Sequence, residues 1–152
     1  MRILLSLIIF AFFSSTVFAD EWESARIELE AQKKIKIAQS LPLDDDESEA
    51  FWDVYNDYQN DQSKLMKQSF DLMKRYTDEY ESNSISDQEA ENMLAEYFRI
   101  EHKEIQLKES YLPKFQVIIP SKKVFLFYQL DNKIDALVRC DIAKQLPLIK
   151  TD

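Results

Sequence analysis

Apolar positions recur at helical spacing over four long stretches of the chain, with short polar breaks between them. The chain contains no glycine and only four prolines, so few residues interrupt these stretches. Residues 21–40, 44–80, 87–118 and 121–145 are therefore predicted to form helices. The predicted fold class is all-α, with four helices.

The breaks carry helix start signals. Asp44 can cap the second helix, and Glu47 three residues later completes a capping-box pattern. Ser86 and Glu89 repeat this pattern before the third helix. Pro113 lies inside the third helix, where it removes a backbone hydrogen bond and clashes with the preceding turn. A kink or a break is expected there.

The second helix has the strongest apolar pattern of the four. At about 100° per residue, one narrow arc holds Phe51, Tyr55, Tyr58, Gln62, Leu65, Ser69, Leu72, Tyr76 and Tyr80. This arc is typical of a coiled-coil seam. A shoulder on one side of it holds Trp52, Met66, Phe70 and Met73. The shoulder is the candidate surface for a client, a partner or a second copy, because methionine and aromatic side chains suit adaptable binding, although core packing accounts for it equally well.

The first helix has a weaker stripe, formed by Ile27, Ala31, Ile35 and Ala38. A basic stretch, KKIK, lies near its end, where cations suit the helix dipole. We expect this helix to be the least firmly packed.

The fourth helix carries one polar residue on its apolar side. The arc consists of Phe127, Leu130, Ile134, Leu137 and Val138, and Asp131 falls inside it. A carboxylate on a packed face needs a cation or several donors, because burying it unpaired is costly. Asp131 is therefore predicted to pair across helices with Arg99, Lys103 or Arg75, and to help specify how this helix docks.

Other side chains of the fourth helix lie off that arc. Cys140 is on the opposite side, so it should be near solvent, where it could form an intermolecular disulfide or stay free. It is the only cysteine, which excludes an intrachain disulfide. Asp135 can pair with Arg139 one turn further on.

The N-terminus is predicted to be a signal peptide. Arg2 precedes an apolar run, and Val17-Phe18-Ala19 supplies a cleavage site, so residues 1–19 would be removed. The run from Ile3 to Phe13 is short for a membrane span of roughly 20 residues. The prediction is a single periplasmic domain over residues 20–152, without stable membrane insertion.

The charge balance and the composition exclude several classes of function. Without Arg2 the chain has 18 basic and 28 acidic side chains, a net charge of −10. This argues against nucleic acid, which requires clustered cations, and suits basic partners. The absence of glycine excludes phosphate loops and nucleophile elbows. No nucleophile or oxyanion hole accompanies the many carboxylates, so neither an enzyme nor a cofactor is expected.

A metal site is the weakest of the candidate sites. His102 lies near Glu101, Glu104 and Glu109, and a histidine with carboxylates can bind zinc. A lone histidine among charged residues is more typical of a solvated helix face. Metal sensing is therefore kept only as an alternative function.

Two short segments indicate a family resemblance. Leu43-Asp44-Asp45-Asp46-Glu47 and Ile119-Pro120-Ser121-Lys122-Lys123 occupy the positions of the Leu-Thr-x-x-Gln motifs that open helices in the Spy/CpxP superfamily. Asp44 replaces threonine in the first copy, and Pro120 and Lys123 replace threonine and glutamine in the second. From roughly Leu41 to Ile149 the chain resembles an exported branch of that superfamily with the same ending.

The resemblance implies a periplasmic protein with four helices in an elongated, hairpin-like arrangement that forms an antiparallel homodimer. It implies an ATP-independent, chaperone-like stress protein that binds unfolded or envelope proteins. A regulatory adaptor of an envelope-stress or sigma-factor pathway is the alternative. The chaperone members use a basic concave surface, from which a chain with a net charge of −10 departs.

Overall fold

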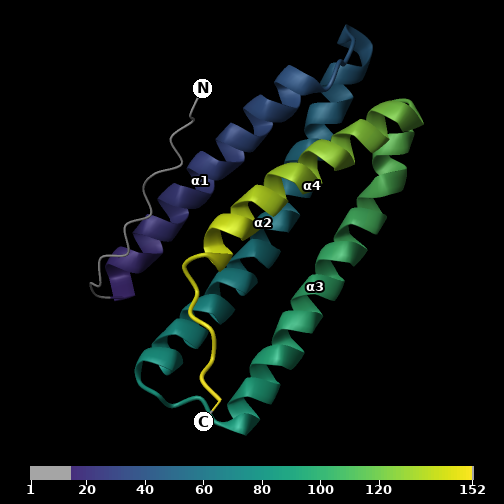
Figure 1. The fold of residues 1–152 in the computed structure, drawn as a ribbon. Helices are drawn as coiled ribbons and strands as arrows, with labels where there is room; N and C mark the ends of the chain where they lie inside the picture. Colours follow the sequence, from purple (N-terminus) through teal and green to yellow (C-terminus); the bar gives the residue numbers. More distant parts are fainter. Residues whose placement is uncertain (1–14, 152) are drawn as a thin grey trace.

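The computed structural model describes residues 15–151, with side chains from Glu23 onward, and this part of the chain contains helices and no strand (Figure 1). The helices are α1 (Ser15–Ser40), α2 (Asp45–Glu81), α3 (Asp87–Gln116) and α4 (Ser121–Ala143). The all-α prediction is confirmed. The predicted signal peptide lies mostly in residues 1–14, outside the described residues, and α1 begins before the predicted start at residue 21.

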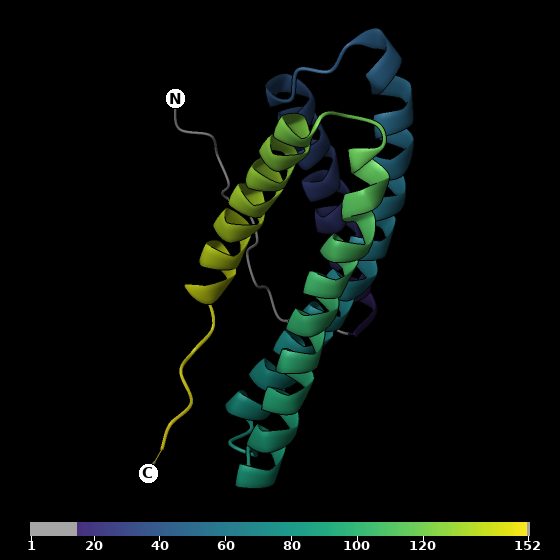
Figure 2. The ribbon, with the colours of Figure 1, turned by 90° about the vertical axis from the view of Figure 1, so that its right-hand side faces the viewer.

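The four helices run alternately up and down, and α2 and α3 form a long antiparallel hairpin (Figure 1). Figure 2 shows α1 and α4 beside only the part of this hairpin that lies away from the α2–α3 turn. The C-terminal segment continues from α4 toward that turn. The molecule therefore has an end built from four helices and an end built mainly from two.

Local signals position the ends of the hairpin helices. The Asp44 carboxylate accepts a hydrogen bond from the backbone N–H of Glu47 (3.0 Å), and the Glu47 carboxylate accepts one from the N–H of Asp44 (3.1 Å). Ser86 caps α3 by accepting from the N–H of Glu89 (3.2 Å). In the turn between the helices Asn83 has φ 51°, a left-handed conformation that asparagine tolerates and that glycine usually supplies.

Two apolar clusters form the core. The larger one fills the four-helix end and consists of Ile37, Leu41, Phe51, Tyr55, Tyr58, Tyr111, Phe115, Ile119, Val124 and Phe127. Its aromatic rings meet mostly edge to face or tilted, as their quadrupoles favour. The smaller cluster, between α2 and α3, consists of Leu72, Met93 and Ile100, with Tyr76 packed against it. Most of the hydrophobic stabilisation therefore lies at the four-helix end.

The prediction that Ile27, Ala31, Ile35 and Ala38 form the packed stripe of α1 is wrong. Ile27 and Ile35 are exposed, whereas Lys33 and Ile37 are the buried residues of α1 from Glu23 onward, where its side chains are described. A helix with few large apolar residues is oriented by whichever contacts its neighbours offer. Here α2 and α4 offer charged and polar partners for Lys33.

Pro113 does not break α3. The helix continues to Gln116, and the Val117 N–H bonds to the Pro113 carbonyl (3.3 Å). Tyr111 and Phe115, on either side of the proline, are both buried in the larger cluster. Tertiary packing therefore maintains the helix across the residue that would otherwise end it.

Candidate functional site

A buried polar centre lies inside the four-helix end, among residues of α1, α2 and α4. It consists of Lys33, Tyr58, Gln62, Asp131 and Asp135. Lys33 is 5% exposed and Asp131 is fully buried. Such burial of charged groups is tolerated only where they are paired.

Lys33 contacts both carboxylates of the centre. Its Nζ lies 2.6 Å from Asp131 Oδ1, an ionic contact without hydrogen-bond geometry, and donates a hydrogen bond of 2.8 Å to Asp135 Oδ1. It also donates to Gln62 Oε1 (3.0 Å). The Tyr58 hydroxyl donates to Asp131 Oδ2 (2.8 Å), so both oxygens of this carboxylate have a partner.

The electrostatics of the centre favour the charged lysine and the neutral tyrosine. Burial alone would lower the pKa of Lys33, but Asp131 and Asp135 outweigh it and raise the pKa above its ordinary value. Burial, and then the negative charge of Asp131, raise the pKa of Tyr58 well above its usual range. The centre is therefore an ion-paired network in which Lys33 stays charged and Tyr58 stays neutral near neutral pH.

The burial of Asp131 and its pairing across helices are confirmed, but the expected partners are wrong. Arg75 pairs with Glu96 (2.8 Å) instead, and Arg99 also lies beside Glu96 (3.4 Å). Lys103 lines a groove between α2 and α3 on another side of the hairpin. Arg75 and Arg99 pair within the α2–α3 hairpin, and Lys103 lies on another side of α3. Asp131 instead takes its nearest cation, Lys33, from α1, and Lys108 of α3 lies 3.9 Å from its Oδ2.

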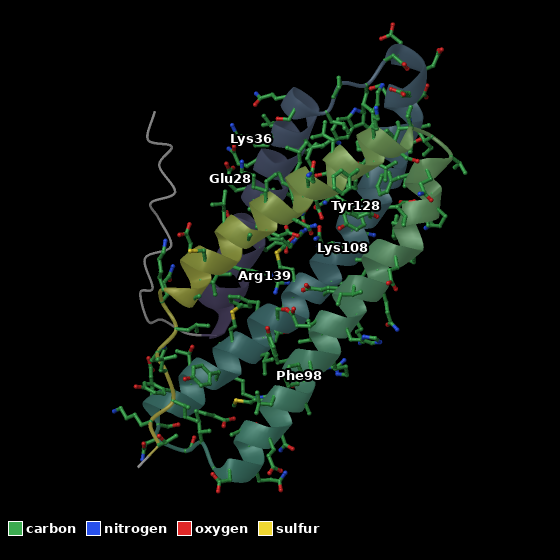
Figure 3. The ribbon with its side chains drawn as sticks, turned by 45° about the vertical axis from the view of Figure 1, so that its right-hand side comes forward. Glu28, Lys36, Phe98, Lys108, Tyr128 and Arg139 are labelled. Carbon is green, nitrogen blue, oxygen red and sulfur yellow. The ribbon has the colours of Figure 1, made fainter. Side chains whose placement is uncertain are left out.

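The expected pair between Asp135 and Arg139 is also wrong. Arg139 reaches across to α3, where it contacts Glu101 (2.6 Å) and Glu104. Figure 3 shows Arg139 on α4 facing α3, with Lys108 and Tyr128 in the same space between the two helices. Because Arg139 pairs with residues of α3, Asp135 contacts Lys33 and Lys108 instead, and Lys108 Nζ lies 3.7 Å from Asp135 Oδ2.

A groove runs along this junction of α3 and α4. It is lined by Glu101, Glu104, Ile105, Lys108, Asn132, Asp135, Ala136 and Arg139. Burial raises the pKa of Glu104, and the charge of Arg139 opposes this shift only in part. Most of the side chains that line the groove are polar or charged, and two are apolar, Ile105 on α3 and Ala136 on α4.

The side of α3 next to this groove carries a row of exposed apolar residues. We define the α3 row as Leu94, Phe98, Ile105 and Leu112. At 100° per residue these four fall within about 40° of one another and extend over about 27 Å. Phe98 is 63% exposed and Ile105 is 56% exposed. In Figure 3 Phe98 lies on α3 and is nearer to the α2–α3 turn than Arg139, which lies on α4.

The α2 shoulder that the sequence singles out is only half buried. Trp52 packs against the larger core cluster, and Lys34 of α1 lies over its ring, 5.4 Å from the centroid. Met66, Phe70 and Met73 are also of intermediate exposure. The most exposed apolar side chains of the hairpin therefore lie on α3, away from the shoulder.

The remaining candidate residues lie at the surface. Cys140 is free and exposed. His102 is exposed, and the described part of the chain holds no cluster of three or more histidine, cysteine or carboxylate side chains able to bind a metal. Within residues 15–151 no helix combines the length and apolar character needed to cross a bilayer.

The chain matches no protein-family model, no curated protein and no solved structure.

Two features of the structure escape the sequence-based predictions. Lys33 belongs to the basic stretch assigned to the helix dipole, and nothing local distinguishes it from its exposed neighbours Lys34 and Lys36. The α3 row does have a signal, since Phe98, Ile105 and Leu112 recur every seven residues. That spacing predicts an apolar stripe, although the stripe's exposure becomes evident only when the other helices are placed.

Proposed function

We propose that this protein is a non-enzymatic, periplasmic helical scaffold that binds exposed apolar segments of other envelope proteins and limits their aggregation. The observation that carries the proposal is the α3 row. Exposed apolar residues aligned on one face of a helix commonly form interaction sites, because leaving them in water is unfavourable. The Spy/CpxP-like motifs and the predicted export signal support the same proposal.

The architecture suits a rigid binding platform. The row lies on α3, which is held against α2 by both core clusters and against α4 by Arg139. A client could therefore bind along the row without requiring the scaffold to rearrange, which reduces the cost of ordering on binding.

An aggregation assay tests the proposal. The protein should suppress light scattering by a chemically denatured client at near-equimolar ratio, without ATP. The double substitution Phe98→Ser/Ile105→Ser should remove most of this effect. Ile27→Ser/Leu137→Ser is the matched control, because these two side chains are 55% and 62% exposed but lie on α1 and α4.

Equal activity of the two double variants would show that the row is not the binding surface. No suppression by the unmodified protein would overturn the chaperone-like function and favour the regulatory adaptor.

The proposal includes a homodimer, with the α2 shoulder as its candidate interface. Sedimentation equilibrium should give twice the mass of one chain, and Met66→Ser/Met73→Ser should weaken this association. A monomer at all concentrations would remove the dimer from the proposal. Non-reducing gels would separately show whether Cys140 crosslinks two chains.

A further inference from the structure

We infer that the α3 row binds amphipathic helical segments that carry flanking lysine and arginine residues. The inference rests on the proposed function, and it specifies the chemical class of the client. It depends on the charges beside the row and on how poorly the row suits a second copy of this chain.

The charges left without a partner beside the row are negative. Glu91 and Glu109 lie on its outer side, both exposed, and neither forms an ion pair within the described residues. On the inner side Glu101 and Glu104 share Arg139. Lys108 is turned toward α4, where it donates to Asn132 Oδ1 (2.7 Å). A cationic partner would thus find unpaired carboxylates on the outer side of the row, at Glu91 and Glu109.

The pattern of the row disfavours pairing with a second copy. Phe98, Ile105 and Leu112 form one set with seven-residue spacing, whereas the companion set is Leu94, Glu101 and Lys108. Parallel pairing of two copies would place Glu101 against Glu101 and Lys108 against Lys108, which is repulsive. Antiparallel pairing would place Glu101 against Ile105 and Lys108 against Phe98. Neither arrangement makes a continuous apolar seam.

A separate amphipathic helix with basic flanks avoids these conflicts. Its apolar residues at i, i+4 and i+11 can contact the row, as in helix recognition along an apolar groove. Its lysines can reach Glu91 and Glu109 without displacing Arg139. The net charge of −9 for the whole chain adds long-range attraction for such a segment.

Three model peptides with identical apolar residues and with lysine, glutamine or glutamate flanks would test the inference by fluorescence anisotropy. The lysine peptide should bind about tenfold tighter than the glutamate peptide, and added salt should reduce the difference. Phe98→Ser/Ile105→Ser should weaken binding of all three peptides.

The carboxylates are tested by a matched pair of variants. Glu91→Gln/Glu109→Gln should reduce the preference for the lysine peptide severalfold. Glu28→Gln/Glu49→Gln removes the same charge from exposed residues of α1 and α2 and should preserve the preference.

The possible outcomes separate this inference from the proposed function. Equal binding of the three peptides, or unchanged preference in Glu91→Gln/Glu109→Gln, would overturn the inference alone. Suppression of client aggregation without binding of any peptide would do the same. A change in oligomeric mass caused by Phe98→Ser/Ile105→Ser would identify a second copy as the occupant of the row. If the unmodified protein neither binds any of the peptides nor suppresses aggregation, both proposals are overturned.

Discussion

Lys33 carries its charge in the interior of the four-helix end, where it contacts two carboxylates of α4. Asp131 has 0% exposure, so water cannot replace the lysine as its partner, and the other nearby cation, Lys108, is more distant, 3.9 Å from Asp131 Oδ2. Replacing one member of a buried ion pair costs far more than the pair itself contributes, because the other charge is left uncompensated.

Lys33→Met should therefore lower the free energy of unfolding by about 3–5 kcal/mol. Lys36→Met is the control, because Lys36 lies three residues away on α1 and is exposed. Its effect should stay within about 0.5 kcal/mol. Urea denaturation followed by circular dichroism measures both values, and similar losses for the two variants would contradict the assigned role of Lys33.

A second substitution separates charge from packing. Lys33→Met/Asp131→Leu removes both members of the closest pair, so no carboxylate is left fully buried without a cation. The double variant should be more stable than Lys33→Met alone, since apolar replacements of buried pairs are often tolerated. A further loss of stability in the double variant would show that the shape of these side chains matters more than their charge.

At the scale of the elements, α1 depends on few contacts. From Glu23 onward, where its side chains are described, its buried residues are Lys33 and Ile37, whereas α2 and α3 each contribute four buried residues to the two clusters. The sequence predicts α1 to be the least firmly packed helix, and this small buried set agrees with that expectation.

Hydrogen exchange should show that α1 is less protected than α2 and α3. Amides of α1 should exchange faster than those of α2 around Phe51–Tyr58, because local opening requires less buried surface to be exposed. In Lys33→Met the protection of α1 should fall further while the α2–α3 hairpin keeps most of its protection. Uniform loss of protection over all four helices would show instead that α1 unfolds only with the whole molecule.

The start of α2 offers a second test at this scale. Asp44→Ala removes the side chain that accepts from the Glu47 N–H, and should cost about 1 kcal/mol of unfolding free energy. Asp45→Ala in the same turn removes only an exposed charge near the helix dipole, worth a few tenths of a kcal/mol. Chemical denaturation of the two variants would distinguish them, and equal effects would argue against the cap.

At the scale of the whole molecule, buried tyrosines make stability depend on alkaline pH. Burial raises the pKa of Tyr128 to about 12, followed by the effect of nearby Asp131. Burial and the hydrogen bond to Asp61 raise the pKa of Tyr111 to about 12. The pKa values of Tyr58 and Lys33 are raised as well. The folded state therefore retains protons that the unfolded chain loses near pH 10.

Since these pKa values are raised on folding, their stabilising contribution is complete below about pH 10 and is lost as pH rises through the folded-state values. The free energy of unfolding should decline between about pH 10 and 12. Tyr111→Phe/Tyr128→Phe should make the decline shallower. Urea titrations at each pH, combined with tyrosinate absorbance, measure this, and a slope identical to that of the unmodified protein would contradict it.

The sequence by itself determined the four helices, the caps at Asp44 and Ser86, and the presence of a carboxylate on the packed side of α4. These depend on local spacing and on backbone hydrogen bonds within a few residues. A helical wheel also predicted the aromatic seam of α2, because its residues are large enough to dominate any packing arrangement.

Only the tertiary structure decided which faces are covered. The helical wheel relates residues of one helix to each other, but it does not say where the neighbouring helices lie. The sequence therefore predicts that Asp131 needs a cation, but it does not predict that this cation comes from α1, the helix with the weakest apolar pattern. For the same reason the regularly spaced residues of the α3 row remain exposed, because α1 and α4 do not cover that face of α3.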